Sequence, residues 1–209
     1  MKKHTLLLFL FIAVLIACQN EPDDTKVLQA NSENVETNPV NDIRNLMVEY
    51  LIWGDTVRNI DLLPVIADSV DSFYVDIDSI QLGKTISSLK KAGFFSNDFL
   101  EQYQSLVFEL GKKLRTENFQ WYVGEMPPMR FASGSNPWCN CQDNLEWTEI
   151  VVKPINLEKT SGQLIWKWGG FKENTHPGWG KFEYKFNVKL IDNEWKISYL
   201  EGFDLDLIQ

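Results

Sequence analysis

The sequence predicts an α+β fold, in which N-terminal helices pack on a curved antiparallel sheet of about four main strands. Three observations predict it: an amphipathic stretch over residues 96–115, alternating apolar runs within residues 145–203, and a hairpin signal at Asp192-Asn193. The chain has 209 residues, enough for one domain with a substantial core.

The clearest strand signal runs from Lys181 to Leu190, where apolar and polar residues alternate. Alternation of this kind is typical of a strand with one buried and one solvent-exposed face. Asp192-Asn193 tolerates positive φ, and the alternation resumes at Trp195, Ile197 and Tyr199, which predicts a hairpin. The residues expected on the buried face of the first strand are Phe182, Tyr184, Phe186, Val188 and Leu190.

Shorter elements are expected before the sheet. Residues 41–57 carry an apolar stripe at helical spacing, and Asp42 is a suitable N-cap. Residues 62–67 suggest a short second helix interrupted by Pro64, and residues 73–78 alternate as a short strand does.

Two further helices are expected ahead of the long irregular segment. Residues 84–92 indicate a modest helix that Gly93 ends. Residues 96–115 give the strongest helical pattern, with Ser96 as N-cap and basic residues in the last turn. Its apolar stripe is wide enough to cover the apolar face of the sheet.

The first 17 residues have the pattern of a lipoprotein signal peptide. Two lysines precede an apolar run over residues 6–16, which is too short to span a bilayer. Leu15-Ile16-Ala17-Cys18 then resembles the lipobox of bacterial lipoproteins. That resemblance implies cleavage before Cys18, lipid attachment to its sulfur, and near-permanent membrane anchoring by several acyl chains. The alternative is an uncleaved N-terminal anchor helix.

Residues 18–40 are expected to form the lipidated cysteine and a flexible acidic spacer, followed by one domain over residues 41–209. The acidic start of the spacer resembles the surface-export signal of Bacteroidetes lipoproteins, and Gln19 is not the aspartate associated with inner-membrane retention. The alternative is a plain linker. We therefore expect an outer-membrane lipoprotein of the cell envelope, with either membrane face possible.

The charge of the chain excludes some partners. The net charge is −9, and removal of Lys2 and Lys3 with the signal peptide makes it more negative. An acidic body disfavours nucleic-acid binding, which needs phosphate neutralisation. The membrane is expected as a partner only through the lipid at Cys18.

Cys139 and Cys141 are the cysteines that remain. Outside the cytoplasm they could form a strained disulfide, since a Cys-x-Cys pair lies near the upper limit of disulfide span. Two free thiols are the alternative. Metal binding is not expected, because no further Cys/His pair completes a zinc site.

Three segments resemble the nuclear-transport-factor-2-like group of α+β cone folds. Residues 95–100 are similar to the start of its long helix, and residues 136–143 to the loop before its first long strand. Residues 193–199 resemble its final strand. The resemblance covers residues 41–203 and implies a curved sheet wrapped around helices, with a cavity inside.

Candidate chemical groups are few. His176 lies in a turn-like segment and reads as an exposed histidine. Asp68, Asp71, Asp76 and Asp78 could share calcium, although a solvated acidic face is favoured because the glycine of an EF-hand loop is missing. We assign no catalytic residue, no metal ligand and no cofactor.

Aromatic residues are the remaining candidates for a site. They form either the core or the wall of a pocket that holds a ligand. The expected wall residues are Phe131, Trp138, Trp166, Trp168, Tyr184, Trp195 and Tyr199.

Three functions fit these features. The first is an envelope-anchored lipoprotein that binds a small molecule, a glycan or a protein in a pocket or on an aromatic loop. The second is an acid/base enzyme of the dehydratase, isomerase or hydrolase type, and the third is a purely structural lipoprotein. The absence of a recognisable catalytic set favours the first.

Overall fold

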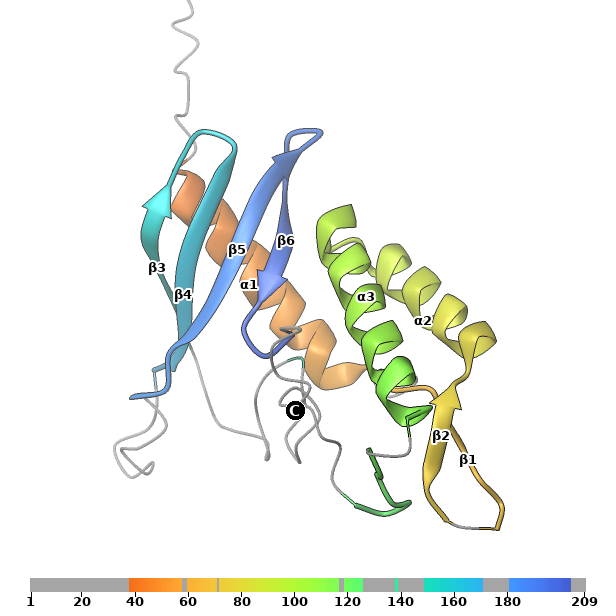
Figure 1. Cartoon of the computed structure of the whole chain (residues 1–209). Coiled ribbons are helices and arrows are strands. Elements are labelled where there is room, and N and C mark those ends of the chain that lie inside the picture. The colour runs from red at the N-terminus through yellow and green to blue at the C-terminus, as the bar shows by residue number, and fades with distance from the viewer. Residues whose placement is uncertain are drawn as a thin grey trace, which may run out of the picture. The chain divides into compact units, whose positions relative to one another are not determined.

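The structure of the chain is a computed structural model, and it describes residues 38–57, 60–70, 72–116, 119–125, 138, 149–170 and 181–203. The chain divides into two compact units, Met1–Glu36 and Thr37–Gln209, and every described residue belongs to the second. In this unit, helices precede an antiparallel sheet, which confirms the predicted α+β class (Figure 1).

The described elements are three helices and six strands. Their bounds are α1 Pro39–Thr56, β1 Val65–Ala67, β2 Tyr74–Ile77, α2 Ser79–Ala92, α3 Asn97–Leu114, β3 Glu149–Leu157, β4 Ser161–Gly169, β5 Tyr184–Ile191 and β6 Glu194–Leu200. Strands β1 and β2 form a small sheet, and the larger sheet has the order β3-β4-β5-β6. No described helix is long and apolar enough to cross a membrane.

Each of the three described helices begins directly after an N-cap residue. Ser96 caps α3 as predicted, through a hydrogen bond that its hydroxyl accepts from the Phe99 N–H. Asn38, rather than Asp42, caps α1, because Pro39 occupies the first helical position and starts the helix one turn earlier. Asp78 caps α2 by accepting from two backbone N–H groups, so this helix begins before residue 84.

The short helix expected over residues 62–67 was wrong. Residues 65–67 are instead strand β1, which pairs with β2 so that Val65 lies opposite Ile77. The predicted strand at 73–78 is confirmed as β2. Pairing with a partner strand outweighed the weak local helix signal, and sequence periodicity cannot show such pairing.

The large sheet is an antiparallel meander with one apolar face. The predicted inner residues Phe186 and Val188 are both buried, and Phe186 lies directly opposite Leu164, which is also buried. Phe182 differs from the prediction, because β5 begins at Tyr184 and the Phe182 side chain is 51% exposed. Residues 192 and 193 both have positive φ, which confirms the predicted hairpin turn.

A β-bulge changes the alternation in β6. Ile197 lies opposite Val188, whereas Tyr199 lies opposite Asn187. The extra residue between them shifts the pattern by one position, so Leu200 turns to the buried face and Tyr199 to the outer face. The alternation read from the sequence therefore failed at Tyr199.

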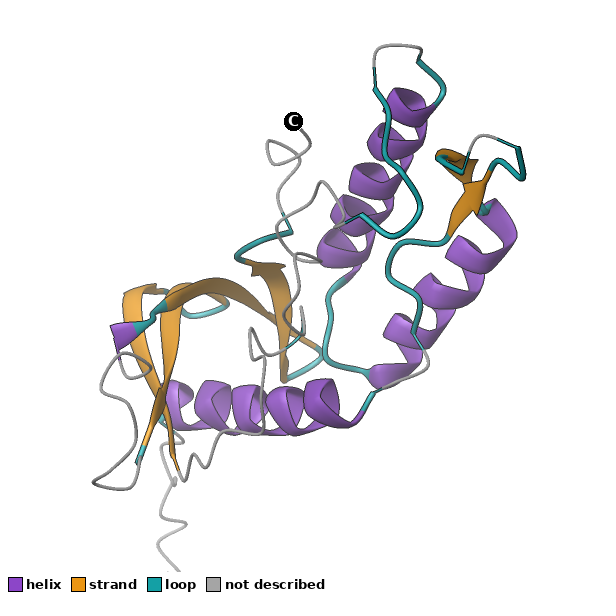
Figure 2. Cartoon of the chain, turned by 90° about the horizontal axis from the view of Figure 1, so that it is seen from below, coloured by secondary structure: helices purple, strands orange, loops and turns teal. Residues whose placement is uncertain are grey.

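Helix α1 lies along the inner face of the sheet. It contacts both edge strands, β3 and β6, so the sheet bends around it (Figure 2). Helix α3 contacts β6 and the small strand β2. The cover that the sequence assigned to residues 96–115 is therefore shared, and α1 supplies the part that spans the sheet.

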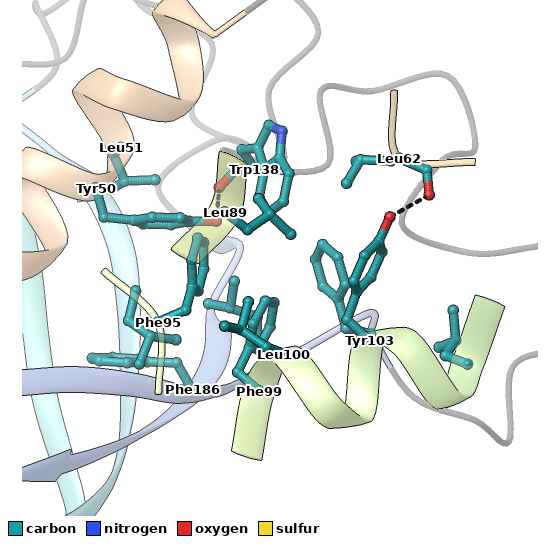
Figure 3. Packing of buried hydrophobic residues seen from close by; sticks show 14 of the residues in the cluster. Tyr50, Leu51, Leu62, Leu89, Phe95, Phe99, Leu100, Tyr103, Trp138 and Phe186 are labelled. Atoms are coloured by element: carbon teal, nitrogen blue, oxygen red, sulfur yellow. Dashed lines mark hydrogen bonds between the residues drawn. The ribbon is translucent and has the colours of Figure 1, made fainter. Parts of the chain in front are cut away.

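Aromatic rings fill the interior where α1 and α3 approach the sheet (Figure 3). Trp138 stacks on Phe203 and meets the ring of Trp53 edge-on, with ring centroids 5.6 and 5.1 Å apart. The Tyr50 hydroxyl donates to the Trp138 carbonyl oxygen at 2.6 Å. Residue 138 belongs to the long segment between α3 and β3, and this buried hydrogen bond joins it to α1.

Candidate functional site

The aromatic residues predicted to line a pocket lie in three places. Trp138, Trp166 and Trp168 are buried, and Tyr184 is half-buried beside Trp166 with ring centroids 4.7 Å apart. The gap among Trp138, Trp166 and Tyr184 has no space for a water molecule. These four residues therefore pack as part of the core.

The other predicted wall residues are separated from that cluster. Trp195 lies at the open end of the inner face, opposite Leu190 in the hairpin. Tyr199 lies on the outer face, and Phe131 is outside the described residues. Cys18, Cys139, Cys141 and His176 are also outside them.

The buried ionisable groups with shifted pKa are tyrosines. Burial raises the pKa of Tyr50 well above 10.0. Burial and then the charge of Asp61 raise the pKa of Tyr103, whose hydroxyl donates to the Leu62 carbonyl oxygen at 2.7 Å. All these hydroxyls are neutral at pH 7 and act as donors to backbone rather than as bases.

The predicted aspartate cluster has local structural partners. Asp68 accepts from the Val70 N–H at 2.6 Å, and Asp78 caps α2. Asp76 forms an exposed ion pair with Arg115, and Asp71 is outside the described residues. Among the described residues, no group of three or more His, Cys, Asp or Glu side chains could hold a metal ion.

A groove of about 730 Å³ lies between α1 and the β5–β6 hairpin. Its floor is apolar and comes from four half-buried side chains, Leu46, Phe94, Leu190 and Trp195. Helix α1 contributes residues at positions i, i+3, i+4 and i+7, which fall on one helical face. These are Asp42, Asn45, Leu46 and Glu49.

Charged side chains surround this floor. Lys196 donates to the Gly93 carbonyl oxygen at 2.7 Å and to Glu194 at 2.6 Å, which joins the hairpin to the α2–α3 connection. The hydrogen bond from Lys196 and its positive charge lower the pKa of Glu194. Asp42 and Glu49 form no ion pair within the described part of the chain, so the α1 side of the groove is negative.

The backbone around the groove is fixed by hydrogen bonds. Residues 94–96 run beside β6, where the Ile197 N–H donates to the Phe94 carbonyl oxygen at 2.8 Å and the Ser96 N–H to the Ile197 carbonyl oxygen at 2.9 Å. These two hydrogen bonds hold the Phe94 side of the groove against β6.

Sequence reasoning found Trp195 and missed the other groove residues. Leu46 belongs to the apolar stripe of residues 41–57 and reads as an ordinary core position. Phe94 lies outside the patterns from which the elements were predicted. The signal that existed was polar: Asp42, Asn45 and Glu49 share a helical face with Leu46.

Comparison with known proteins returned no match to a protein-family model, a curated protein or a solved structure.

Proposed function

We propose that this chain is an envelope-anchored lipoprotein that binds an amphipathic small molecule in the groove between α1 and the β5–β6 hairpin. The single observation that carries the proposal is the groove itself, with its apolar floor and, on its α1 side, the carboxylates of Asp42 and Glu49, which are unpaired among the described residues. Its volume of about 730 Å³ falls within the range of small-molecule sites.

The floor and the rim select different parts of a ligand. Trp195 and Leu46 present half-buried apolar surface, so an aliphatic or aromatic body gains free energy by covering them. Asp42 and Glu49 lie on the same side of the groove and favour a cationic head group. The ligand class is therefore an apolar chain with a positively charged end.

The lipid anchor and the cone belong to the same proposal. Lipid on Cys18 would hold the domain to the membrane through the spacer that joins α1 at Pro39, a residue of the groove edge. Helices that precede a four-stranded antiparallel meander, with α1 against both edge strands, support a nuclear-transport-factor-2-like cone. In such a fold an opening between helix and sheet is a natural place for a ligand.

Three matched amphiphiles test this function. Octylamine, octanol and octanoate are titrated by calorimetry into the mature chain, residues 18–209, with Cys18→Ser to prevent lipid attachment. We expect octylamine to bind tightest and octanoate weakest, since the tail is shared and only the head group meets Asp42 and Glu49.

Variants locate the binding. Trp195→Ala removes apolar floor and should weaken all three ligands, whereas Glu49→Gln should weaken octylamine alone. Phe108→Ala is the control, because Phe108 is an exposed aromatic residue on α3 that does not line the groove. No binding by any amphiphile, or equal loss in the Phe108 control, would refute the proposed function.

A further inference from the structure

The outer face of the large sheet carries a row of polar side chains across all four strands. Asn156 of β3 lies opposite Gln163 of β4, Gln163 opposite Asn187 of β5, and Asn187 opposite Tyr199 of β6. Because neighbouring strands lie about 4.8 Å apart, the row is about 14 Å long. The two β-bulges, in β3 and in β6, bring Asn156 and Tyr199 into it.

The three amides of this row have unused hydrogen-bonding capacity. Asn156 and Gln163 are exposed and Asn187 is half-buried, and none bonds through its side chain to another described residue. A hollow of about 250 Å³ lies over them, and Glu158, Ser161, Lys189 and Ser198 also line it. The Glu158 carboxylate accepts a hydrogen bond from the Ser161 hydroxyl at 3.1 Å. Each amide offers donors and an acceptor in a fixed line, because the strands hold the backbone.

Two lysines flank the row on one side. Lys153 and Lys185 lie on either side of Ile165 in the next register position, and both are exposed. Neither forms an ion pair within the described residues, whereas Lys189 pairs with Asp98 and Lys167 lies 4.0 Å from Glu183. In a chain of net charge −9, two unpaired lysines beside an amide row favour a ligand that carries separated negative charges.

We propose that this face binds an acidic oligosaccharide in an extended conformation. Sugar hydroxyls both donate and accept, which matches the side-chain amides of Gln163 and Asn187. Carboxylate or sulfate groups on the sugar meet Lys153 and Lys185. Nucleic acid fits less well, because phosphate at every residue would meet the acidic side chains elsewhere on the surface.

This site is independent of the groove. Leu190 and Trp195 of the groove belong to the inner face, and the amide row belongs to the outer face of the same strands. A change at one site therefore leaves the other intact, which separates the two proposals experimentally.

The test uses oligogalacturonate and its methyl ester, which differ in charge and share the sugar hydroxyls. Both are titrated by calorimetry into the mature chain with Cys18→Ser. We expect oligogalacturonate to bind about tenfold more tightly than the ester, as loss of charge-assisted hydrogen bonds requires. Absence of oligogalacturonate binding, or equal affinity for the ester, overturns the proposal.

Three double variants divide the contributions. Lys153→Gln with Lys185→Gln should lower oligogalacturonate affinity about tenfold and leave the ester unchanged. Gln163→Ala with Asn187→Ala should weaken both saccharides. The control, Lys84→Gln with Lys91→Gln on α2, makes the same charge change at exposed positions away from the sheet.

The losses of saccharide affinity in these variants distinguish a specific binding site from general electrostatic attraction. Equal loss in the sheet and control lysine pairs, or no loss in the amide pair, overturns the proposal. Trp195→Ala should leave saccharide binding unchanged, and its circular dichroism spectrum checks that the sheet is intact. Octylamine binding that persists in the Lys153/Lys185 variant shows that the groove functions by itself.

Discussion

The two faces of the β3–β6 sheet differ in what they require of their residues. On the inner face Trp166, Phe186 and Ile197 are almost completely buried. On the outer face Lys153 and Gln163 are exposed, although they belong to the same strands. Apolar burial on one face stabilises the sheet and fixes its register, and this leaves the opposite face free to carry polar groups in a fixed arrangement.

Substitutions in β4 are expected to show the largest difference in stability between the two faces. Trp166→Ala should lower the free energy of unfolding by about 3–5 kcal/mol, because it leaves a large void beside Tyr184. Gln163→Ala, on the other face of the same strand, should change it by less than about 0.5 kcal/mol. Urea unfolding of both variants measures this, and similar losses would contradict the division between the faces.

A pair of helical glycines tests how tightly the inner side is packed. A Cβ at Gly54 of α1 would lie 2.7 Å from the Trp138 Cβ, so Gly54→Ala should cost about 1–3 kcal/mol. A Cβ at Gly83 of α2 meets nothing within 4 Å. Gly83→Ala should therefore stabilise by about 0.5–1 kcal/mol, through the better helix propensity of alanine.

Thermal melts of the two glycine variants give the comparison directly. A Gly54→Ala protein as stable as the parent would show that Trp138 does not press against α1. That outcome would remove residue 138 from the aromatic cluster of the interior.

The helix cap beside β6 should have an intermediate effect. Ser96 is buried and its hydroxyl accepts from the Phe99 N–H at 3.3 Å, so Ser96→Ala should cost about 1 kcal/mol. Ser88→Ala is the matched control at an exposed position within α2, and it should change stability by less than about 0.5 kcal/mol. Equal midpoints in guanidinium would mean that the cap contributes nothing.

The smallest effect is expected for the ion pair of the outer face. Lys189 pairs with Asp98 of α3, and both side chains are about half exposed. Lys189→Gln should cost at most about 1 kcal/mol, and the loss should shrink as salt screens the charges. Lys185→Gln, which breaks no ion pair, is the reference, and a salt-independent loss at Lys189 would point to packing rather than charge.

The sequence predicted the elements with the strongest periodicity. The α3 stripe, its Ser96 cap, and the hairpin at Asp192-Asn193 were all read from local pattern. Local pattern was sufficient there because a wide apolar stripe identifies an amphipathic helix, and a pair of turn residues identifies a hairpin, without knowledge of the segments that pack against them.

Elements that depend on a distant partner were missed. Strand β1 exists because Val65 pairs with Ile77, whereas residues 62–67 by themselves were predicted to be a short helix. Tyr199 moved to the outer face because the bulge in β6 lies against β5. Neither event has a local signature, since each is decided by hydrogen bonds between segments.

The candidate groove also depends on contacts between segments that are distant in the sequence. The only one of its residues that the sequence assigned to a pocket wall is Trp195. The groove forms where α1, residues 92–94 and the β5–β6 hairpin meet, and that meeting is a property of packing. The amide row likewise needs the register of four strands, which no single strand contains.

By itself, the amino-acid sequence determined the α+β class, the alternation that makes one sheet face apolar, and the expectation of a lipid anchor at Cys18. Tertiary structure alone decided that α1 spans the sheet and that Tyr199 and three amides share a row. The physical reason is range: periodicity and capping act within a few turns of chain, whereas register, bulges and grooves arise where segments far apart in sequence compete for the same contacts.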